Sequence, residues 1–302
     1  MANKAAVAAR DTVTLRSGRS RDSDVKSLVF LGALWFSLFF GILVLLILIV
    51  STAVKGAPRF DLNLLTNYGS ALNPGETGFR AGILGSVFVM AVTAAMAIPL
   101  GIAAALYLEE FANGARWYNR LIEVNLQNLA AVPSVVYGLL AVAAVDALGV
   151  AQRGLVISGA VALSLLILPV IIITTREAVR AVPKEIRHGS LALGATTWQT
   201  TWRQTLPSAV PGIATGTILG LSRAIGEAAP LLIIGTATAI RFDPNGLMSQ
   251  FTALPLQIYS LTSQSQEDFR IAASAAIIVL LIMILGLNAV AIFIRNKFQR
   301  SW

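Results

Sequence analysis

Residues 183–230 read PKEIRHGSLALGATTWQTTWRQTLPSAVPGIATGTILGLSRAIGEAAP, and their character changes midway. The first half is polar, basic and amphipathic, and it carries Gly194 and the Leu206–Pro207 pair. The second half is apolar and rich in glycine, yet it holds two charges, Arg223 and Glu227. A polar docking element followed directly by a charged membrane helix predicts a machine in which something outside the bilayer moves something inside it.

The composition of the chain is that of a membrane protein. Hydrophobic residues make up 56% of the 302 residues, and the mean hydropathy is +0.74, well above the values of soluble domains. There is no cysteine and only one histidine, which excludes disulfides and metal sites built from several Cys or His ligands. The formal charge of +8 would suggest nucleic acid binding in a soluble protein, so it must first be tested against topology.

Charged residues divide the chain into apolar segments. Six segments with few or no charges are each long enough to cross about 30 Å of hydrocarbon at about 1.5 Å per residue. We therefore predict an all-α polytopic membrane protein with six transmembrane helices. These are expected in residues 28–54, 81–108, 124–152, 154–175, 204–240 and 271–294.

The distribution of Lys and Arg predicts the orientation. With the N-terminus inside, 16 of the 23 basic residues fall in inside segments and 6 in outside segments, as the positive-inside rule requires. We predict a multi-pass protein of the plasma (inner) membrane with both termini cytoplasmic. Topology then explains the basic charge, so no nucleic acid partner is expected. The predicted non-membrane ends and first loop are a cytoplasmic tail at 1–27, an external loop at 55–80 and a C-terminal tail at 295–302.

The third predicted span contains AVPSVVYGLL, in which Pro133 removes one backbone donor and should kink the helix. Ser134 and Tyr137 stand where they can repair or exploit that break, and we take them as candidate residues of a substrate pathway. From this feature alone, an ordinary proline kink buried against its neighbours is the simpler interpretation. A broken helix near mid-membrane is also how transporters expose backbone groups to a substrate.

The fifth predicted span carries two charges inside the membrane. Gly212, Gly216 and Gly220 form a small-residue stripe at helical spacing, and Arg223 and Glu227 continue it, so both charges should face protein or water rather than lipid. A charge at the bilayer centre costs at least ~2.5–3.5 kcal/mol on insertion scales, so it needs a partner or a purpose. The pair could merely lock helices together. The functional interpretation is that Arg223 meets an anion and Glu227 balances it when the path is empty.

The segment before this span has the spacing of a surface helix, with apolar residues at Ile186, Leu191, Leu193 and Trp198. Gly194 should allow a tight turn between two short helices. A solvated amphipathic linker on the membrane surface would explain the same spacing. The length of the segment, its exposed apolar side chains and the exit at Pro207 favour docking into a groove of a partner protein.

At this point the sequence resembles a known family. Cytoplasmic loops of ABC importer permeases carry Glu-Ala-Ala, three residues, Gly, nine residues, Ile, one residue and Leu-Pro. Gly194, Leu206 and Pro207 stand at this spacing, while His188–Ser190 replace Glu-Ala-Ala and Gln204 replaces Ile. The resemblance implies a type I ABC importer permease (MetI-like) core at 81–294, with a coupling helix in the loop 176–207 and an accessory helix at 28–54. It places ATPase coupling on His188, Ser190, Leu191, Gly194, Ala195, Trp198, Leu206 and Pro207.

Further strings narrow the resemblance to phosphate-specific importers. These are AIPLGIAAALYLEEFA, AVPSVVYGL, SRAIGEAAPLL and ALPLQIYSL, in that order along residues 80–270. GEAAPLL and LPLQIY are more similar to the PstA-type permease than to its PstC-type companion. The resemblance places Arg223 and Glu227 on the phosphate pathway. It implies four kinds of partner: a PstC-type second permease, two PstB-type ATPase subunits, an external PstS-type binding protein and inorganic phosphate, all at a lipid membrane.

The chain lacks the means to hydrolyse ATP itself. No GxxxxGK[ST] phosphate-binding loop occurs in it, and six spans leave no room for a nucleotide-binding domain. We therefore expect this chain to be a non-catalytic subunit that binds no cofactor, with ATP and Mg²⁺ bound by partner ATPase subunits.

Three alternatives remain open from the residues alone. Electrostatics does not separate phosphate from sulfate or molybdate. A proton-coupled secondary transporter could use Asp146 or Glu227 as a proton relay, but the amphipathic loop would then lack a purpose. A membrane enzyme would need a nucleophile and a base, and the one histidine, His188, lies in a basic loop without a clear triad.

Overall fold

The computed structural model describes residues 25–70, 72–113, 116–150 and 152–298. Most of the predicted tail at 1–27 and the last four residues of the tail at 295–302 lie outside these ranges. The chain divides into two units at Val50. The first contains most of α1 (Val25–Gly56), an apolar helix long enough to cross a membrane, where the sequence predicts an accessory span.

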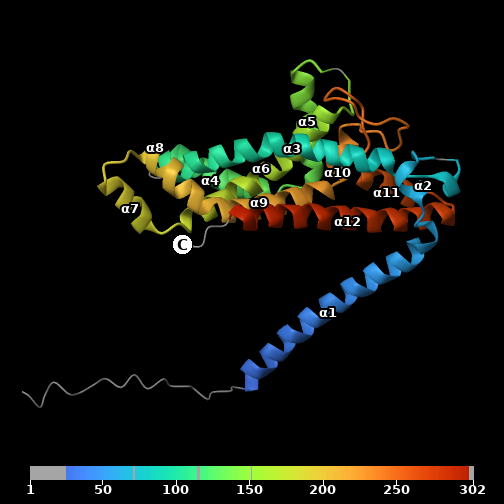
Figure 1. Ribbon diagram of the computed structural model, residues 1–302, viewed down its shortest axis with the longest axis horizontal. Coiled ribbons are helices and arrows are strands. Elements are labelled where there is room, and N and C mark those ends of the chain that lie inside the picture. The colour runs from blue at the N-terminus through green and yellow to red at the C-terminus, as the bar shows by residue number, and fades with distance from the viewer. Residues whose placement is uncertain (1–24, 71, 114–115, 151, 299–302) are drawn as a thin grey trace, which may run out of the picture. The chain divides into compact units, whose positions relative to one another are not determined.

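The second unit is built around α6 (Val156–Arg180). Helices α3 (Arg80–Leu106) and α9 (Leu206–Ile225) both pack against α6, and α12 (Glu267–Phe298) packs against α9 (Figure 1). Two thirds of the most apolar window of α6 are buried, because helices cover it on several sides. The central hydrophobic core includes Leu163, Ile167 and Ile171 of this helix.

Short elements occupy the two ends of this bundle (Figure 1). At one end lie α2 (Leu62–Thr66) and α11 (Leu254–Thr262), and at the other end lie α7 (Lys184–Ala192) and α8 (Thr197–Thr200). Single-turn 3₁₀ helices at Ala57–Arg59 and Pro74–Glu76 flank α2. Apart from one antiparallel bridge between Leu155 and Gln250, the regular structure of the described ranges is helical. The predicted all-α fold is confirmed.

Glycines allow the helices of the bundle to approach closely. A Cβ on Gly212 would meet the Ala178 Cβ at 2.6 Å, and one on Gly216 would collide with the Thr174 side chain of α6. Gly220 continues the same row at ordinary contact distance from Ile171. The predicted small-residue stripe of α9 is confirmed as the surface that packs on α6.

The predicted interruption of the third span, 124–152, at Pro133 is confirmed, although it separates two helices rather than kinking one. The chain forms α4 (Trp117–Ala130) and α5 (Ser134–Ala147), whose axes differ by 115°. Pro133 stands outside both helices as the N-cap of α5, with extended backbone angles, because a proline has no amide to donate and holds the residue before it out of the helical region. The chain therefore turns at this point rather than bending.

The predicted fifth span, 204–240, is wrong as a continuous helix. Helix α9 ends at Ile225, the five-residue α10 (Ala229–Ile233) follows, and the chain is irregular from Gly235 to Ala253. Gly226 caps α9, and Pro230 lacks the amide that would continue its hydrogen-bonding ladder. Glu227 consequently lies beyond the helix that carries Arg223.

The predicted number of six transmembrane helices is not confirmed. In the described ranges four helices are long and apolar enough to cross a membrane, or five if the bent α4–α5 pair is one span. The four include α1, α3, α6 and α12. Helix α9 falls outside this set because threonine, serine, proline, glycine and Arg223 lower its apolar character.

Candidate functional site

The helices α7 and α8 form a compact hairpin at the end of the bundle, here called the α7–α8 hairpin (residues 184–205, with the π-helical turn Thr201–Thr205). Gly194 lies between the two helices with φ +85°, a left-handed conformation that suits glycine because it has no Cβ. Thr196 starts α8 with a capping box, in which it and Gln199 each accept a hydrogen bond from the other's backbone amide. The predicted turn at Gly194 between two short helices is confirmed.

The α7–α8 hairpin is held together by polar and apolar contacts. The hydroxyls of Ser190 and the buried Thr200 share a hydrogen bond of 2.9 Å between α7 and α8. Below them, Ile186 and Leu206 pack against an apolar cluster that includes Leu106 and Val179 from α3 and α6. One face of the hairpin is thus fastened to the bundle.

The opposite face of the hairpin is open. Leu193 is 90% exposed, and His188, Leu191 and Trp198 are exposed as well. Between the two arms lies a groove of about 560 Å³. Residues lining it include the half-buried Ser190 and Ala195, together with Gly194. Six of the eight residues predicted for ATPase coupling therefore lie on the open hairpin, and the other two, Leu206 and Pro207, lie where it joins the bundle.

The hairpin continues into the bundle without a break. Residues Thr197–Thr200 are α-helical, Thr201–Thr205 are π-helical and Leu206–Ile225 are α-helical, and the residues at both junctions keep helical backbone angles. Pro207 stands just after the π-turn and Pro211 lies inside α9, so each removes one amide donor although the chain stays helical at both positions. A π-turn inside an α-helix is frequently a functional feature. Displacement of α8 would therefore act directly on α9.

The two predicted pathway charges lie at the far end of α9 from the hairpin. Arg223 is in the last turn of that helix, and its Nε is 3.8 Å from Oε1 of Glu227, too far for a hydrogen bond. The Arg223 side chain is 41% exposed in this chain. A weak internal ion pair on an accessible arginine leaves the guanidinium able to bind an anion.

The structure places Tyr137 within electrostatic range of Arg223. Its phenol interacts electrostatically with Arg223, and its hydroxyl donates a hydrogen bond of 2.5 Å to the Leu129 carbonyl across the α4–α5 break. Tyr137 is buried, whereas Ser134 is half-buried in the first turn of α5. The structure gives Tyr137 a clear role in closing the break, and the pathway roles of Ser134 and Tyr137 remain predictions.

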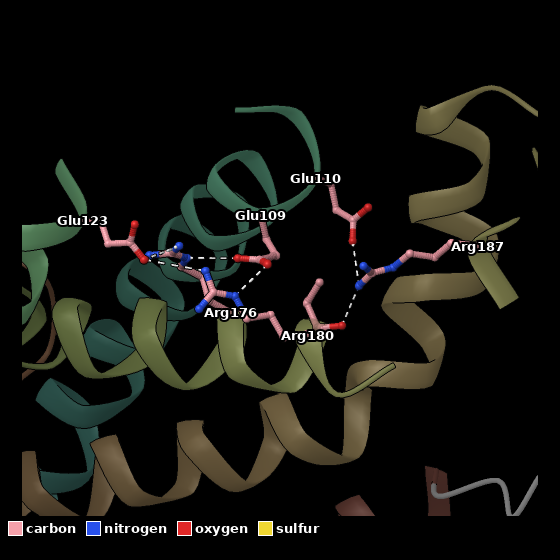
Figure 2. Close-up of polar contacts among 7 residues, drawn as sticks. Glu109, Glu110, Glu123, Arg176, Arg180 and Arg187 are labelled. Carbon is pink, nitrogen blue, oxygen red and sulfur yellow. Dashed lines mark hydrogen bonds and ion pairs between the residues drawn. The ribbon is translucent and has the colours of Figure 1, made fainter. Parts of the chain in front are cut away.

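A charged cluster missed at the sequence level lies between the hairpin and the bundle (Figure 2). Arg176 of α6 is 11% exposed and bridges Glu109 at 3.3 Å and Glu123 at 2.9 Å. Arg180 pairs with Glu109 at 2.7 Å, and Arg187 of α7 pairs with Glu110 at 3.0 Å. Three glutamates and three arginines, from the turn after α3 and from α4, α6 and α7, thus balance one another.

A sequence signal for this cluster existed. Glu109 and Glu110 follow the long apolar run of α3 directly, and Arg176 and Arg180 stand four residues apart on one face at the end of α6. Opposite charges at the same ends of two neighbouring parallel helices are expected to pair. The pairing of α6 with α3, which only the tertiary structure shows, was needed to use that signal.

Comparison with known proteins gives the family. Residues 97–302 match the family described as "Binding-protein-dependent transport system inner membrane component". The chain belongs to this family. It is 32% identical over 255 residues to the phosphate transport system permease protein PstA of Xylella fastidiosa, covering 82% of this chain and 85% of the relative. It is 35% identical over 248 residues to the PstA protein of Mycobacterium leprae, covering 81% and 79% of the two chains.

Solved structures of importers share the fold. The permease of a bacterial ABC transporter that imports the polysaccharide alginate covers 92% of this chain and 98% of its own, with a TM-score of 0.61 and 16% identity. The MetNI methionine ABC transporter gives a TM-score of 0.59 at 17% identity, covering 73% of this chain and 97% of its own. The predicted MetI-like permease core is confirmed as a fold.

Proposed function

We propose that this chain is the transmembrane permease subunit of an ATP-driven importer of inorganic phosphate. The names of relatives such as the PstA proteins of Xylella fastidiosa and Mycobacterium leprae support the substrate, since the similarity extends over about four fifths of each chain. The family and the fold support the importer class. The chain is a transport subunit that leaves hydrolysis to its partners.

The observation that carries this proposal is the unbroken helix from the α7–α8 hairpin to Arg223. An exposed groove at one end and a charged, accessible arginine at the other are joined by helical backbone from Thr197 to Ile225. A helix transmits axial and rotational displacement with little loss because its hydrogen bonds hold each turn to the next. ATP-driven movement of a partner docked at the hairpin would thereby reach the pathway residue.

Arg223 would bind phosphate as it passes through the membrane. A planar guanidinium donates paired hydrogen bonds to two oxygens of an oxyanion, which lysine cannot do in the same geometry. Glu227 would compensate the charge of Arg223 between transport events, at the long separation that the structure gives. Binding by one arginine is weak, and weak binding suits transit because the ion must also leave.

The remaining partners follow from this assignment. A PstC-type permease would complete the pathway against the exposed side of Arg223, and two PstB-type subunits would hold ATP and Mg²⁺ at the hairpins. A PstS-type protein would deliver phosphate at the opposite end, on loops that include 55–80. The hairpin and both termini would then face the cytoplasm, with the chain in the plasma (inner) membrane.

The test is uptake of labelled phosphate by proteoliposomes that contain the complete complex, with binding protein outside and ATP enclosed on the hairpin side. We expect wild-type uptake to require ATP, and Arg223→Ala to lower it at least tenfold with the complex intact. The matched control is Arg153→Ala, because Arg153 is also accessible and also forms only a distant ion pair, 3.7 Å from Asp146. It should transport normally.

Each contrary outcome has a definite meaning. Uptake driven by a pH gradient without ATP would replace the importer by a proton-coupled transporter. ATP-driven uptake of sulfate or molybdate in preference to phosphate would keep the class and change the substrate. Unchanged phosphate uptake by Arg223→Ala would return that arginine to a structural role.

A further inference from the structure

The coupling role proposed for the α7–α8 hairpin does not explain a second contact between that hairpin and the bundle. Helix α3 ends in a π-helical turn, Tyr107–Phe111, closed by a 2.8 Å hydrogen bond from the Ala112 amide to the Tyr107 carbonyl. We call this segment the YLEEF turn. It continues the backbone of α3 directly, because Leu106 keeps helical angles at the junction. A side chain held by the YLEEF turn is therefore attached to α3.

Three consecutive residues of the YLEEF turn contact three different elements. Glu109 pairs with the two arginines of α6, Glu110 pairs with Arg187 of α7, and the ring of Phe111 lies 6.0 Å from that of Trp198 in α8. Figure 2 shows Glu109 and Glu110 directed to separate partners. Successive side chains of a helix point in different directions, which allows one turn to serve as a junction.

The ion pair between the YLEEF turn and α7 is shielded from solvent. The Glu110 side chain is 9% exposed and that of Arg187 is 20% exposed. Arg187 also donates a 2.6 Å hydrogen bond to the Val179 carbonyl at the end of α6. On the α8 side, Trp198 stacks on Trp202 with centroids 5.6 Å apart, so the ring that meets Phe111 is itself held in place. Salt screens a shielded ion pair less than a surface ion pair. The YLEEF turn therefore contacts both helices of the hairpin, α7 through Glu110 and α8 through Phe111.

The two carboxylates of the junction form different kinds of contact. Glu109 accepts a 2.7 Å hydrogen bond from Arg180 and lies against the central helix α6. Glu110 forms an ion pair with Arg187 that is not an aligned hydrogen bond, since its buried Oε1 has no hydrogen-bond partner among the described residues. The attraction between the two charges resists separation of α7 from the YLEEF turn.

We propose that the YLEEF turn is a second transmission point, through which movement of the α7–α8 hairpin is passed to α3, with Glu110 and Arg187 as its positioning residues. This inference rests on the proposed coupling role of the hairpin. Through α8 the hairpin moves α9, and through the YLEEF turn it moves α3. These two helices supply most of the lining of an apolar groove of about 690 Å³, so the hairpin controls both of its walls.

The first test compares substrate uptake with ATP hydrolysis in the complete complex. Glu110→Gln/Arg187→Gln removes the ion pair without leaving an unpaired buried charge. We expect it to assemble and hydrolyse ATP at the wild-type rate while phosphate transported per ATP falls about tenfold. Each single substitution should give the same loss, because one joint is broken in each case. Glu123→Gln is the control, since Glu123 belongs to the charged cluster but does not contact the hairpin. A wild-type ratio in the double variant would overturn the proposal.

The second test uses Glu110 and Arg187 unaltered, and it does not depend on phosphate. The chain has no cysteine, so spin labels can be placed on exposed residues of the hairpin, α3 and α12 through Lys184→Cys, Leu100→Cys and Ile282→Cys. Lys184 does not line the groove of the hairpin. Between the ATP-free and vanadate-trapped complexes, we expect the 184–100 distance to stay constant and the 100–282 distance to change. A shift in the first or none in the second would refute transmission to α3. A wild-type complex that trapped nucleotide without importing phosphate would instead contradict the proposed substrate.

Discussion

At the scale of the residue, backbone conformation at one glycine shapes the α7–α8 hairpin. Gly194 adopts φ +85°, and its amide and that of Ala195 turn back to the carbonyls of Leu191 and Ser190. No atom would obstruct a Cβ at this position. The requirement for glycine is therefore one of backbone angle alone, which is why a local sequence signal was sufficient to predict the turn.

We expect Gly194→Ala to destabilise the hairpin by about 1 kcal/mol, because an L-residue pays roughly that much in the left-handed region. Hydrogen exchange of the hairpin amides in the assembled complex should accelerate about fivefold, the factor that corresponds to this free energy. The matched control is Gly189→Ala, which also has open space but lies inside α7 without positive φ. It should slow exchange, because alanine favours helix. Equal effects of the two substitutions would disprove the backbone explanation.

At the scale of the element, the course of α9 depends on its contact with α6. Gly216 lets the two helices meet at Thr174, whose hydroxyl donates a 2.8 Å hydrogen bond to the Val170 carbonyl of its own helix. This bond limits how far the threonine can rotate to admit a larger neighbour. The close approach in turn fixes the position of the helix that joins the hairpin to Arg223.

We expect Gly216→Leu to lower the free energy of unfolding by about 1–3 kcal/mol, the usual cost of overpacking a well-filled interior. Thermal unfolding of the purified complex in detergent would measure it as a lower Tm. The control is Gly286→Leu in α12, where no atom lies within 4 Å of the added Cβ. That substitution should leave Tm unchanged or raise it. If Gly216→Leu were equally harmless, α9 would not be held against α6 as the structure indicates.

At the scale of the whole molecule, the charged cluster fastens the ends of α3, α4 and α6 to the hairpin. Arg176 is its most buried arginine and bridges two glutamates, whereas Arg180 is 53% exposed. An arginine–glutamate ion pair therefore stabilises the protein more at Arg176 than at Arg180, because solvent screens the exposed Arg180.

We expect Arg176→Gln to destabilise the protein by about 3 kcal/mol, since it removes the buried positive charge that bridges Glu109 and Glu123. Arg180→Gln should cost less than about 1 kcal/mol, as exposed ion pairs do. Denaturation of the complex, followed by loss of helical circular dichroism, measures both. Equal destabilisation by the two substitutions would show that burial does not set the strength of the cluster.

Sequence reasoning worked best where the cause is local. Apolar composition predicted the membrane-embedded helical class, glycine spacing predicted the face of α9 that packs on α6, and Gly194 predicted the hairpin turn. It worked least well for the two interrupted spans. An apolar run that contains Pro133, or Gly226 and Pro230, reads as membrane-spanning by composition, but composition does not say whether the chain bends or turns away.

The sequence by itself determined which segments are apolar, where the chain can turn and which family the chain resembles, because these depend on residue type and spacing along one segment. Only the tertiary structure decided that Tyr137 closes the α4–α5 break, that Glu227 lies beyond the helix of Arg223, and that Glu110 of the YLEEF turn meets Arg187 of α7. The physical reason is that an ion pair or a close helix contact needs two surfaces. The pattern of one segment shows that a side chain requires a partner, and the packing of distant segments decides which partner it meets.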